Sequence, residues 1–156
     1  MSLEKAKAHL ERFGLGERIR EFAVSSATVS LAAEALGTEE ARIAKSLSFL
    51  TPDGPILIIA AGDAKVNNSK FKEYFRTKAR MIPTEDVESL IGHGVGGVCP
   101  FGINDGVRVY LDESLFRFDT VYPAAGTAAS AVELSPIELE RASLSLARID
   151  VTTIPE

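Results

Sequence analysis

One pair of neighbouring apolar segments constrains the fold of this chain more than any other feature. Residues 43–50 and 55–61 are rich in apolar side chains, and only Thr51-Pro52-Asp53-Gly54 separates them. Proline, aspartate and glycine in so short a connection indicate a turn, so we predict a β-hairpin. The second segment is apolar at successive positions, which is typical of a strand that is buried on both faces. We therefore expect a sheet with this strand near its centre.

The size and composition of the chain are those of one globular domain. It has 156 residues, of which 46% are hydrophobic and 25% charged, so we expect a single domain over residues 1–156. Charged residues interrupt residues 1–13, and the longest apolar run, residues 56–61, is too short to cross a membrane. The single cysteine excludes an internal disulfide, and the two histidines lack metal-ligand spacing. We expect a cytoplasmic protein with no membrane partner and no cofactor.

Periodic apolar residues with capping residues at their ends predict five helices. These are residues 3–13, a helix capped by Thr28 and ended by Gly37, a helix capped by Asn67 or Asn68 that runs to Phe75, a helix capped by Thr84 and ended by Gly92, and a helix from the capping box at Ser135 to about Leu144. A small polar loop, residues 25–27, precedes the second helix.

Further strands are expected at six places, residues 21–24, 78–82, 107–111, 120–122, 131–134 and 147–151. Hairpin links outnumber regular strand-helix-strand units in this order. The pattern therefore predicts an α/β domain of the α+β type, with a mixed, mainly antiparallel central sheet surrounded by helices.

Lys45 lies at an unusual place for a cation. Strand alternation puts it on the same side as Leu47 and Phe49, which should face the core. A buried ammonium without a partner is costly. Lys45 therefore either extends to water or meets an anion such as a phosphate or a carboxylate.

Residues 92–102 contain five glycines and one proline. Glycines let successive backbone amides turn toward one point, where they can bind a carbonyl oxygen or a phosphate. The spacing matches neither a dinucleotide-binding fingerprint nor a P-loop. A tight structural loop that packs Val95, Val98 and Phe101 inward is the alternative. A third small-residue segment, residues 122–130, is either a pocket wall or a closely packed connection.

Other catalytic patterns are scarce. The chain has no serine nucleophile elbow and no HExxH motif. Only His93 lies near Cys99 in the sequence, which favours a small packed cysteine over a thiol nucleophile. Asp63 follows the apolar strand and is interpreted as a turn or capping group rather than a base.

Basic residues are concentrated between Lys65 and Arg80, where Glu73 is the only acid. The net charge of −5 argues against a broad nucleic-acid surface, and no DNA partner is expected. The cluster is either a solvated face or a local contact for an RNA backbone.

Several short motifs, in this order, resemble the YbaK/EbsC family. They are AAEALG at residues 32–37, IAKSL at 43–47, AGD at 61–63, GGVCPFG at 96–102, AG at 125–126 and VELSP at 132–136. The resemblance spans residues 28–146. This family includes free-standing aminoacyl-tRNA deacylases and the editing insertion of prolyl-tRNA synthetases. It implies a fold like that of those editing domains, with a mixed sheet or a partly open barrel.

The resemblance also implies a site. The lysine that matches Lys45 lies in the family's substrate pocket and is needed for deacylation, and the GxxxP loop that matches residues 96–100 sets backbone amides against the aminoacyl group and the terminal adenosine. The catalytic residues expected here are Lys45, Gly96 and Gly97. The expected substrate-binding residues are Thr28, Ser46, Val98, Cys99, Pro100, Gly126 and Ser130. The expected tRNA-binding residues are Lys65, Lys70, Lys72 and Arg76.

The expected function is hydrolysis of the aminoacyl ester of a mischarged tRNA. The tRNA would be that for proline, and the amino acid would be a small one of the alanine, cysteine and serine class. Lys45 would steady the substrate's charge, and the loop amides would polarise the ester carbonyl. The partner is the mischarged aminoacyl-tRNA, with or without an aminoacyl-tRNA synthetase. Two alternatives stay open: a binding module of the same fold for a nucleotide, a tRNA end or a synthetase, and a hydrolase of free aminoacyl esters.

Overall fold

The computed structural model describes residues 2–23 and 28–155. A central sheet has the strand order β6-β2-β3-β5-β8, and two small sheets pair β1 with β7 and β4 with β9. The strands are β1 (Ile19–Glu21), β2 (Ile43–Thr51), β3 (Gly54–Ala61), β4 (Lys65–Val66), β5 (Arg108–Asp112), β6 (Tyr122–Pro123), β7 (Ser130–Val132), β8 (Ala147–Ile149) and β9 (Thr152–Thr153). The α-helices are α1 (Ser2–Glu11), α2 (Val29–Leu36), α3 (Asn68–Phe75), α4 (Thr84–Ile91) and α5 (Pro136–Ala142). The short 3-10 helices of the described residues are η1 (Gly16–Arg18), η2 (Glu40–Arg42) and η3 (Glu113–Arg117).

The predicted hairpin forms the middle of the central sheet. β2 and β3 pair antiparallel, and Thr51 lies opposite Gly54 at the turn. The mixed sheet is therefore confirmed, with one difference from expectation. Within it only the hairpin is antiparallel, because β6, β5 and β8 each lie parallel to their neighbours. Parallel neighbours need long crossover connections, and the segments between β3, β5 and β8 supply them.

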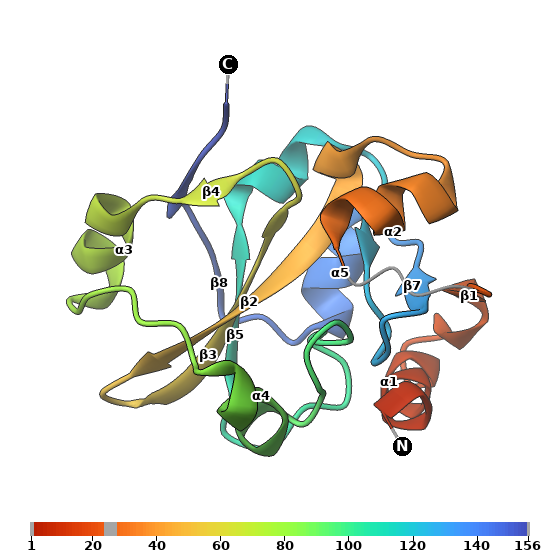
Figure 1. Cartoon of the computed structure of the whole chain (residues 1–156), viewed down its shortest axis with the longest axis horizontal. Helices are drawn as coiled ribbons and strands as arrows, with labels where there is room; N and C mark the ends of the chain where they lie inside the picture. The colour runs from red at the N-terminus through yellow and green to blue at the C-terminus, as the bar shows by residue number, and fades with distance from the viewer. Residues whose placement is uncertain (1, 24–27, 156) are drawn as a thin grey trace.

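β3 is buried on both faces, as its unbroken apolar sequence predicts. Leu57 and Ile59 belong to one apolar cluster, and Ile56 and Ile58 belong to the other. Helix α3 covers the second cluster through Phe71, whereas α1, α4 and α5 cover the first. Figure 1 shows α3 on one side of the central strands and these three helices on the other.

The predicted caps are confirmed at most helix ends. Thr28 Oγ1 accepts a hydrogen bond from the Leu31 N–H at 3.1 Å, and Gly37 ends α2 in the left-handed conformation. Asn67, rather than Asn68, caps α3. Ser135 and Glu138 form the capping box of α5. The predicted loop at residues 25–27 lies outside the described residues.

Other local expectations need correction. Thr84 is the first residue of α4, not its cap, because the Pro83 carbonyl already accepts from the Asp86 N–H. Residues 78–82 form no strand, since Met81 makes a single bridge to Phe49 and Pro83 has no N–H to extend it. The first strand, β1, lies earlier than the predicted residues 21–24 and shares only Glu21 with them, while residue 24 lies outside the described residues. The two-residue strands β4 and β9 were not predicted. Within the described ranges, no helix is long and apolar enough to cross a membrane.

Candidate functional site

A small cavity lies at the outer edge of β2. Among the described residues, that edge pairs with β6 at Ile43 and Ala44, and farther along the Ser48 carbonyl accepts from the Ile82 N–H beside the bridge from Phe49 to Met81. A cavity of about 290 Å³ lies beside this edge. Its lining comes from α2, β2, the start of α4, the glycine loop and the β6–β7 region: Thr28, Val29, Ala32, Ile43, Ala44, Lys45, Ser46, Ser48, Met81, Ile82, Thr84, Val87, Val95, Gly96, Val98, Tyr122, Ala124, Ser130 and Ala131.

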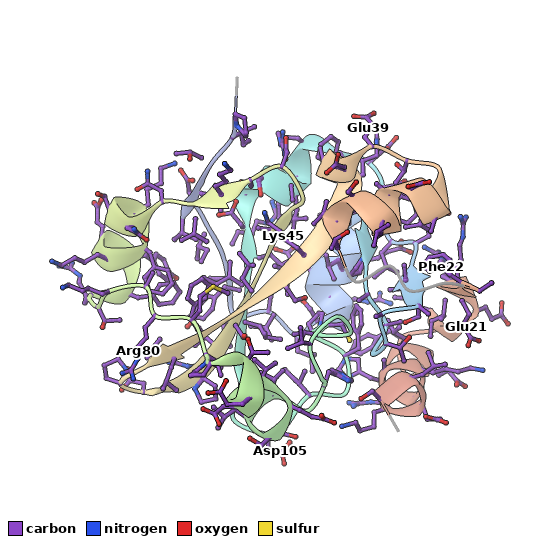
Figure 2. All side chains as sticks on the ribbon, viewed as in Figure 1. Glu21, Phe22, Glu39, Lys45, Arg80 and Asp105 are labelled. Carbon is purple, nitrogen blue, oxygen red and sulfur yellow. The ribbon has the colours of Figure 1, made fainter. Side chains whose placement is uncertain are left out.

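Lys45 brings a positive charge to this cavity. Its Nζ donates to the carbonyls of Gly62, at 3.4 Å, and of Ala64, which follow β3. Burial lowers the pKa of Lys45 from its ordinary value, and the nearby Asp63 carboxylate partly opposes this. Figure 2 shows Lys45 on β2 near the middle of the molecule, with Glu21, Glu39 and Asp105 at the periphery. The ammonium is therefore held in place by two backbone carbonyls.

Asp63 is held by Arg117 rather than left free as a base. Both terminal guanidinium nitrogens of Arg117 donate to its carboxylate, at 2.6 and 3.2 Å. This hydrogen bonding lowers the pKa of Asp63. The interpretation of Asp63 as a structural group agrees with this pairing. Arg117 was missed because it lies 54 residues from Asp63 and carries no local signal.

Ser46 presents an unsatisfied hydroxyl at the cavity. Its Oγ is buried and has no hydrogen-bond partner among the described residues. A buried polar group without a partner costs about 1–3 kcal/mol. In contrast, Ser130 Oγ accepts from Thr127 Oγ1 at 2.9 Å and donates to the Thr127 carbonyl. Of these two lining hydroxyls, only that of Ser46 lacks a protein partner.

The two central glycines of the loop differ in their surroundings. Gly96 lines the cavity with a positive φ of 95°, and its N–H has no partner among the described residues. The Gly97 N–H instead donates to the Gly94 carbonyl at 3.0 Å. A side chain at Gly97 would collide with the backbone of Gly126. Gly97 thus packs the loop, whereas the Gly96 N–H bonds to no other described residue. A role of Gly96 in catalysis stays a prediction.

Three other predicted substrate-binding residues lie behind the cavity wall. Cys99 is fully buried, and burial raises its pKa to about 12, which agrees with a packed residue and not with a thiolate nucleophile. Pro100 lines a separate cavity beside Lys5. Gly126 packs against the Ser2 carbonyl. Their contact with a substrate stays a prediction, as do the roles of Thr28, Val98 and Ser130, which line the cavity.

The predicted tRNA-binding residues lie on β4 and along α3. Lys65 is close enough to Lys45 to contribute to lowering the pKa of that residue. Lys70 is engaged, since its Nζ lies 2.9 Å from an Asp150 carboxylate oxygen and donates to the Thr152 carbonyl. Lys72 and Arg76 are exposed. A tRNA contact at these four residues stays a prediction.

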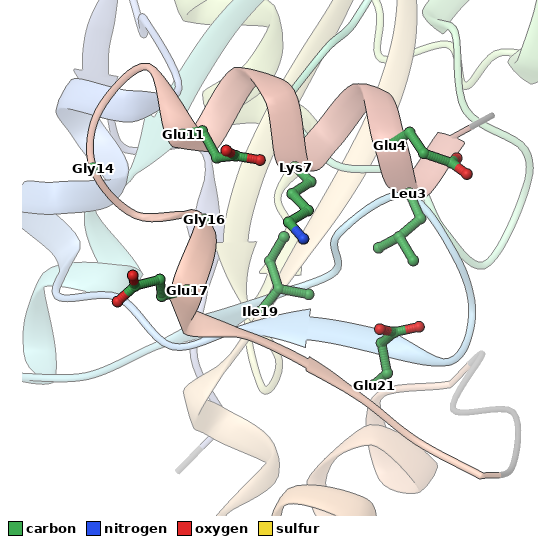
Figure 3. Close-up of a pocket in the computed structure, with 9 residues that line it drawn as sticks. All are labelled: Leu3, Glu4, Lys7, Glu11, Gly14, Gly16, Glu17, Ile19 and Glu21. Atoms are coloured by element: carbon green, nitrogen blue, oxygen red, sulfur yellow. The ribbon is translucent and has the colours of Figure 1, made fainter.

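A second cavity is acidic and lies elsewhere. It has a volume of about 750 Å³ and lies between α1 and β1. Glu4, Glu11, Glu17 and Glu21 line it, and Lys7 is the one basic residue among the described lining residues (Figure 3). Its charge disfavours phosphate groups, so it does not suit an RNA end. No cluster of three or more metal-ligating side chains occurs in the described part of the chain.

Residues 24–142 match the aminoacyl-tRNA editing domain family. This chain belongs to that family. The match takes in every predicted site residue, and the editing-domain fold agrees with the mixed sheet described above. The helix α1 precedes the matched residues.

Relatives of this editing-domain chain include free-standing proteins and parts of ligases. The uncharacterized protein YwhH of Bacillus subtilis is 49% identical over 152 residues, 97% of each chain. A proline–tRNA ligase of Limosilactobacillus fermentum is 32% identical over 94 residues, which are 56% of this chain and 16% of that ligase. A crystal structure of a candidate trans-editing enzyme for prolyl-tRNA synthetase is 30% identical, with a TM-score of 0.88 over 97% of each chain.

Proposed function

We propose that this editing-domain protein acts in trans as an aminoacyl-tRNA deacylase. Its substrate would be a mischarged tRNA, the tRNA for proline, that carries a small amino acid of the alanine, cysteine and serine class. The observation that carries the proposal is that Lys45 and Gly96, whose N–H has no partner among the described residues, line the same small cavity. The free-standing form of YwhH, which matches this chain over 97% of its length, supports action outside a synthetase.

The size of the cavity supports a small aminoacyl group. Its volume of about 290 Å³ lies at the lower end of the range for small-molecule pockets. Apolar side chains such as Val29, Ile82 and Val87 form part of the lining, so a larger amino acid meets steric exclusion rather than a polar partner. Exclusion by size is the principle by which editing sites spare the correct product.

The chemistry follows from the two donors. Water attacks the ester carbonyl carbon, the bond to the ribose oxygen breaks, and the products are a free amino acid and a tRNA with its terminal hydroxyl restored. The Gly96 N–H donates to the carbonyl oxygen as negative charge develops, and the Lys45 ammonium stabilises the same charge. No Asp, Glu or His occurs among the described lining residues. Positioning and electrostatic stabilisation therefore supply the rate, and water or a group of the substrate transfers the proton.

The basic segment would hold the rest of the tRNA. Exposed Lys65, Lys72 and Arg76 can each neutralise a phosphate and so make binding depend on salt. Because Lys70 already pairs with Asp150, its replacement is expected to change tRNA affinity less than replacement of Lys72. The reaction would take place in the cytoplasm, where tRNAs are charged.

The test is release of labelled amino acid from the tRNA for proline charged with alanine, serine, cysteine or proline. We expect the wild type to release one or more of the three small amino acids and to spare proline. Lys45→Met keeps the apolar stem but removes the ammonium, and it should lower kcat by about 10²–10³-fold. Lys7→Met, which removes a cation from the acidic cavity, is the matched control and should keep full activity.

The outcomes separate the proposal from its alternatives. No release from any charged tRNA by folded wild-type protein, with binding retained, would overturn the proposal in favour of a binding module. Equal release from free aminoacyl esters and from charged tRNA would favour a small-molecule hydrolase. Full activity of Lys45→Met would remove Lys45 from the mechanism.

A further inference from the structure

Helix α1 holds both ends of the glycine loop whose middle lines the cavity. At the start of the loop, Lys5 Nζ donates to the Gly92 carbonyl at 2.5 Å. At its end, the Gly102 N–H donates to His9 Nδ1 at 3.1 Å. Lys5 and His9 lie one helical turn apart on α1, so one rigid element spans residues 92–102. We call Lys5 and His9 the α1 clasp.

The contacts of His9 determine its tautomer. Because the Gly102 N–H can only donate, Nδ1 must be the acceptor, and the proton of the neutral ring is on Nε2. That proton is donated to the Ala142 carbonyl, at 2.6 Å, at the end of α5. The ring also stacks on Phe13, with centroids 5.6 Å apart. His9 therefore joins the loop to α5 through one fixed ring.

Backbone contacts connect α1 to the cavity wall without any side chain between them. A Cβ at Gly102 would collide with the Lys5 backbone, and one at Gly126 would collide with the Ser2 carbonyl. Gly97 in turn packs on the Gly126 backbone. Since close-packed backbones cannot compress, a shift of α1 would displace Gly126 and, through it, Gly97, the neighbour of Gly96.

We propose that Lys5 and His9 are positioning residues, which set the place of the Gly96 N–H at the cavity through the two ends of the loop. The part of the proposal that concerns catalysis rests on the deacylase function proposed above. The structural part does not, because it concerns the order of residues 92–102 in the free protein. α1 lies outside residues 24–142, which match the editing-domain family, so the two clasp side chains come from a helix that precedes the matched residues.

The experiment compares variants that break one contact at a time. His9→Asn places an amide oxygen where Nδ1 lies and keeps an acceptor for Gly102, whereas His9→Gln keeps the donor to Ala142 and loses that acceptor. Lys5→Met removes the ammonium that holds Gly92, and Lys7→Met makes the same change on the same helix without touching the loop. Hydrogen exchange of the Gly97 and Gly102 amides, which are bonded to Gly94 and His9, reports the order of the loop.

We expect exchange of these amides to be about tenfold faster in His9→Gln and Lys5→Met than in His9→Asn and Lys7→Met, as the loss of one hydrogen bond predicts. If the wild type is a deacylase, kcat should fall in the same two variants by a similar factor, with KM within about twofold. Equal exchange in all four variants would overturn the proposal. So would equal losses of kcat in His9→Asn and His9→Gln. If the wild type has no deacylase activity, the exchange result alone decides whether the clasp orders the loop.

Discussion

Replacing Asp112 is expected to lower the free energy of unfolding of this protein far more than replacing an exposed acidic residue does. Its side chain is fully buried at the end of β5. One carboxylate oxygen accepts from the Ser114 N–H at 3.0 Å and from Thr152 Oγ1 at 2.7 Å. The other accepts from the Val151 N–H at 2.9 Å. Asp112 thus joins η3 to the segment that follows β8.

The magnitude follows from the donors that Asp112→Ala leaves behind. The N–H groups of Ser114 and Val151 belong to buried residues, and each buried donor without a partner costs about 1–3 kcal/mol. The Thr152 hydroxyl can rotate toward another acceptor. The expected loss of unfolding free energy is therefore about 2–6 kcal/mol, a large part of the 5–15 kcal/mol that is usual for a domain. Asp112→Asn keeps one acceptor oxygen and should lose about half as much.

Urea unfolding followed by far-ultraviolet circular dichroism measures these differences. Asp150→Ala is the control, because Asp150 is 61% exposed and its ion pair with Lys70 is expected to contribute at most about 1 kcal/mol. The expected order of stability is wild type and Asp150→Ala, then Asp112→Asn, then Asp112→Ala. If the free energy of unfolding of Asp112→Ala lay within about 1 kcal/mol of the wild-type value, the reasoning that these buried donors have no other acceptor would be refuted.

Three further predictions concern the glycine loop. Cys99, whose pKa burial raises to about 12, should resist thiol reagents at pH 8 in the native protein and react rapidly in urea. Burial lowers the pKa of His93, so His93 binds a proton more readily in the unfolded chain than in the folded protein. The free energy of unfolding should therefore be highest above about pH 6.5 and fall below that pH. His93→Gln should weaken this dependence, as measured by urea unfolding at pH 5 and pH 7. Gly97→Ala should lower both the melting temperature and the proposed activity, whereas Gly94→Ala, whose new Cβ meets only the Glu88 carboxylate at 3.5 Å, should lower neither.

The parts of the fold that local sequence determines were predictable. Turn residues 51–54 and the apolar run of β3 indicate the hairpin, and Thr28, Asn67 and Ser135 identify three helix starts through their own side chains. The parallel neighbours of β3 and β5 were not predictable, because their partners lie tens of residues away. Strands of two residues, such as β4 and β9, are too short to show alternation.

Some residues of the candidate cavity, Lys45 among them, could be singled out from the sequence, whereas other polar lining residues, Ser48, Thr84 and Tyr122, and the packing around the cavity could not. Lys45 stood out because alternation placed a cation among apolar neighbours, and the glycine loop stood out by composition. Nothing local indicates that the Gly97 N–H is used within the loop or that Cys99 lies behind the wall. The Asp63–Arg117 pair and the contacts of Asp112 likewise depend on tertiary neighbours.

The position of α1 in the chain also affects the order in which the site is assembled during synthesis. His9 bonds to Ala142, 133 residues later, and Lys5 bonds to Gly92, 87 residues later. At 5–20 residues per second, a ribosome needs roughly 7–27 s to make the residues between His9 and Ala142. Throughout that time His9 lacks its partner on α5. The contacts that hold the cavity wall are therefore completed only after α5 has been made, so a chain that still lacks α5 carries Lys45 without an ordered site.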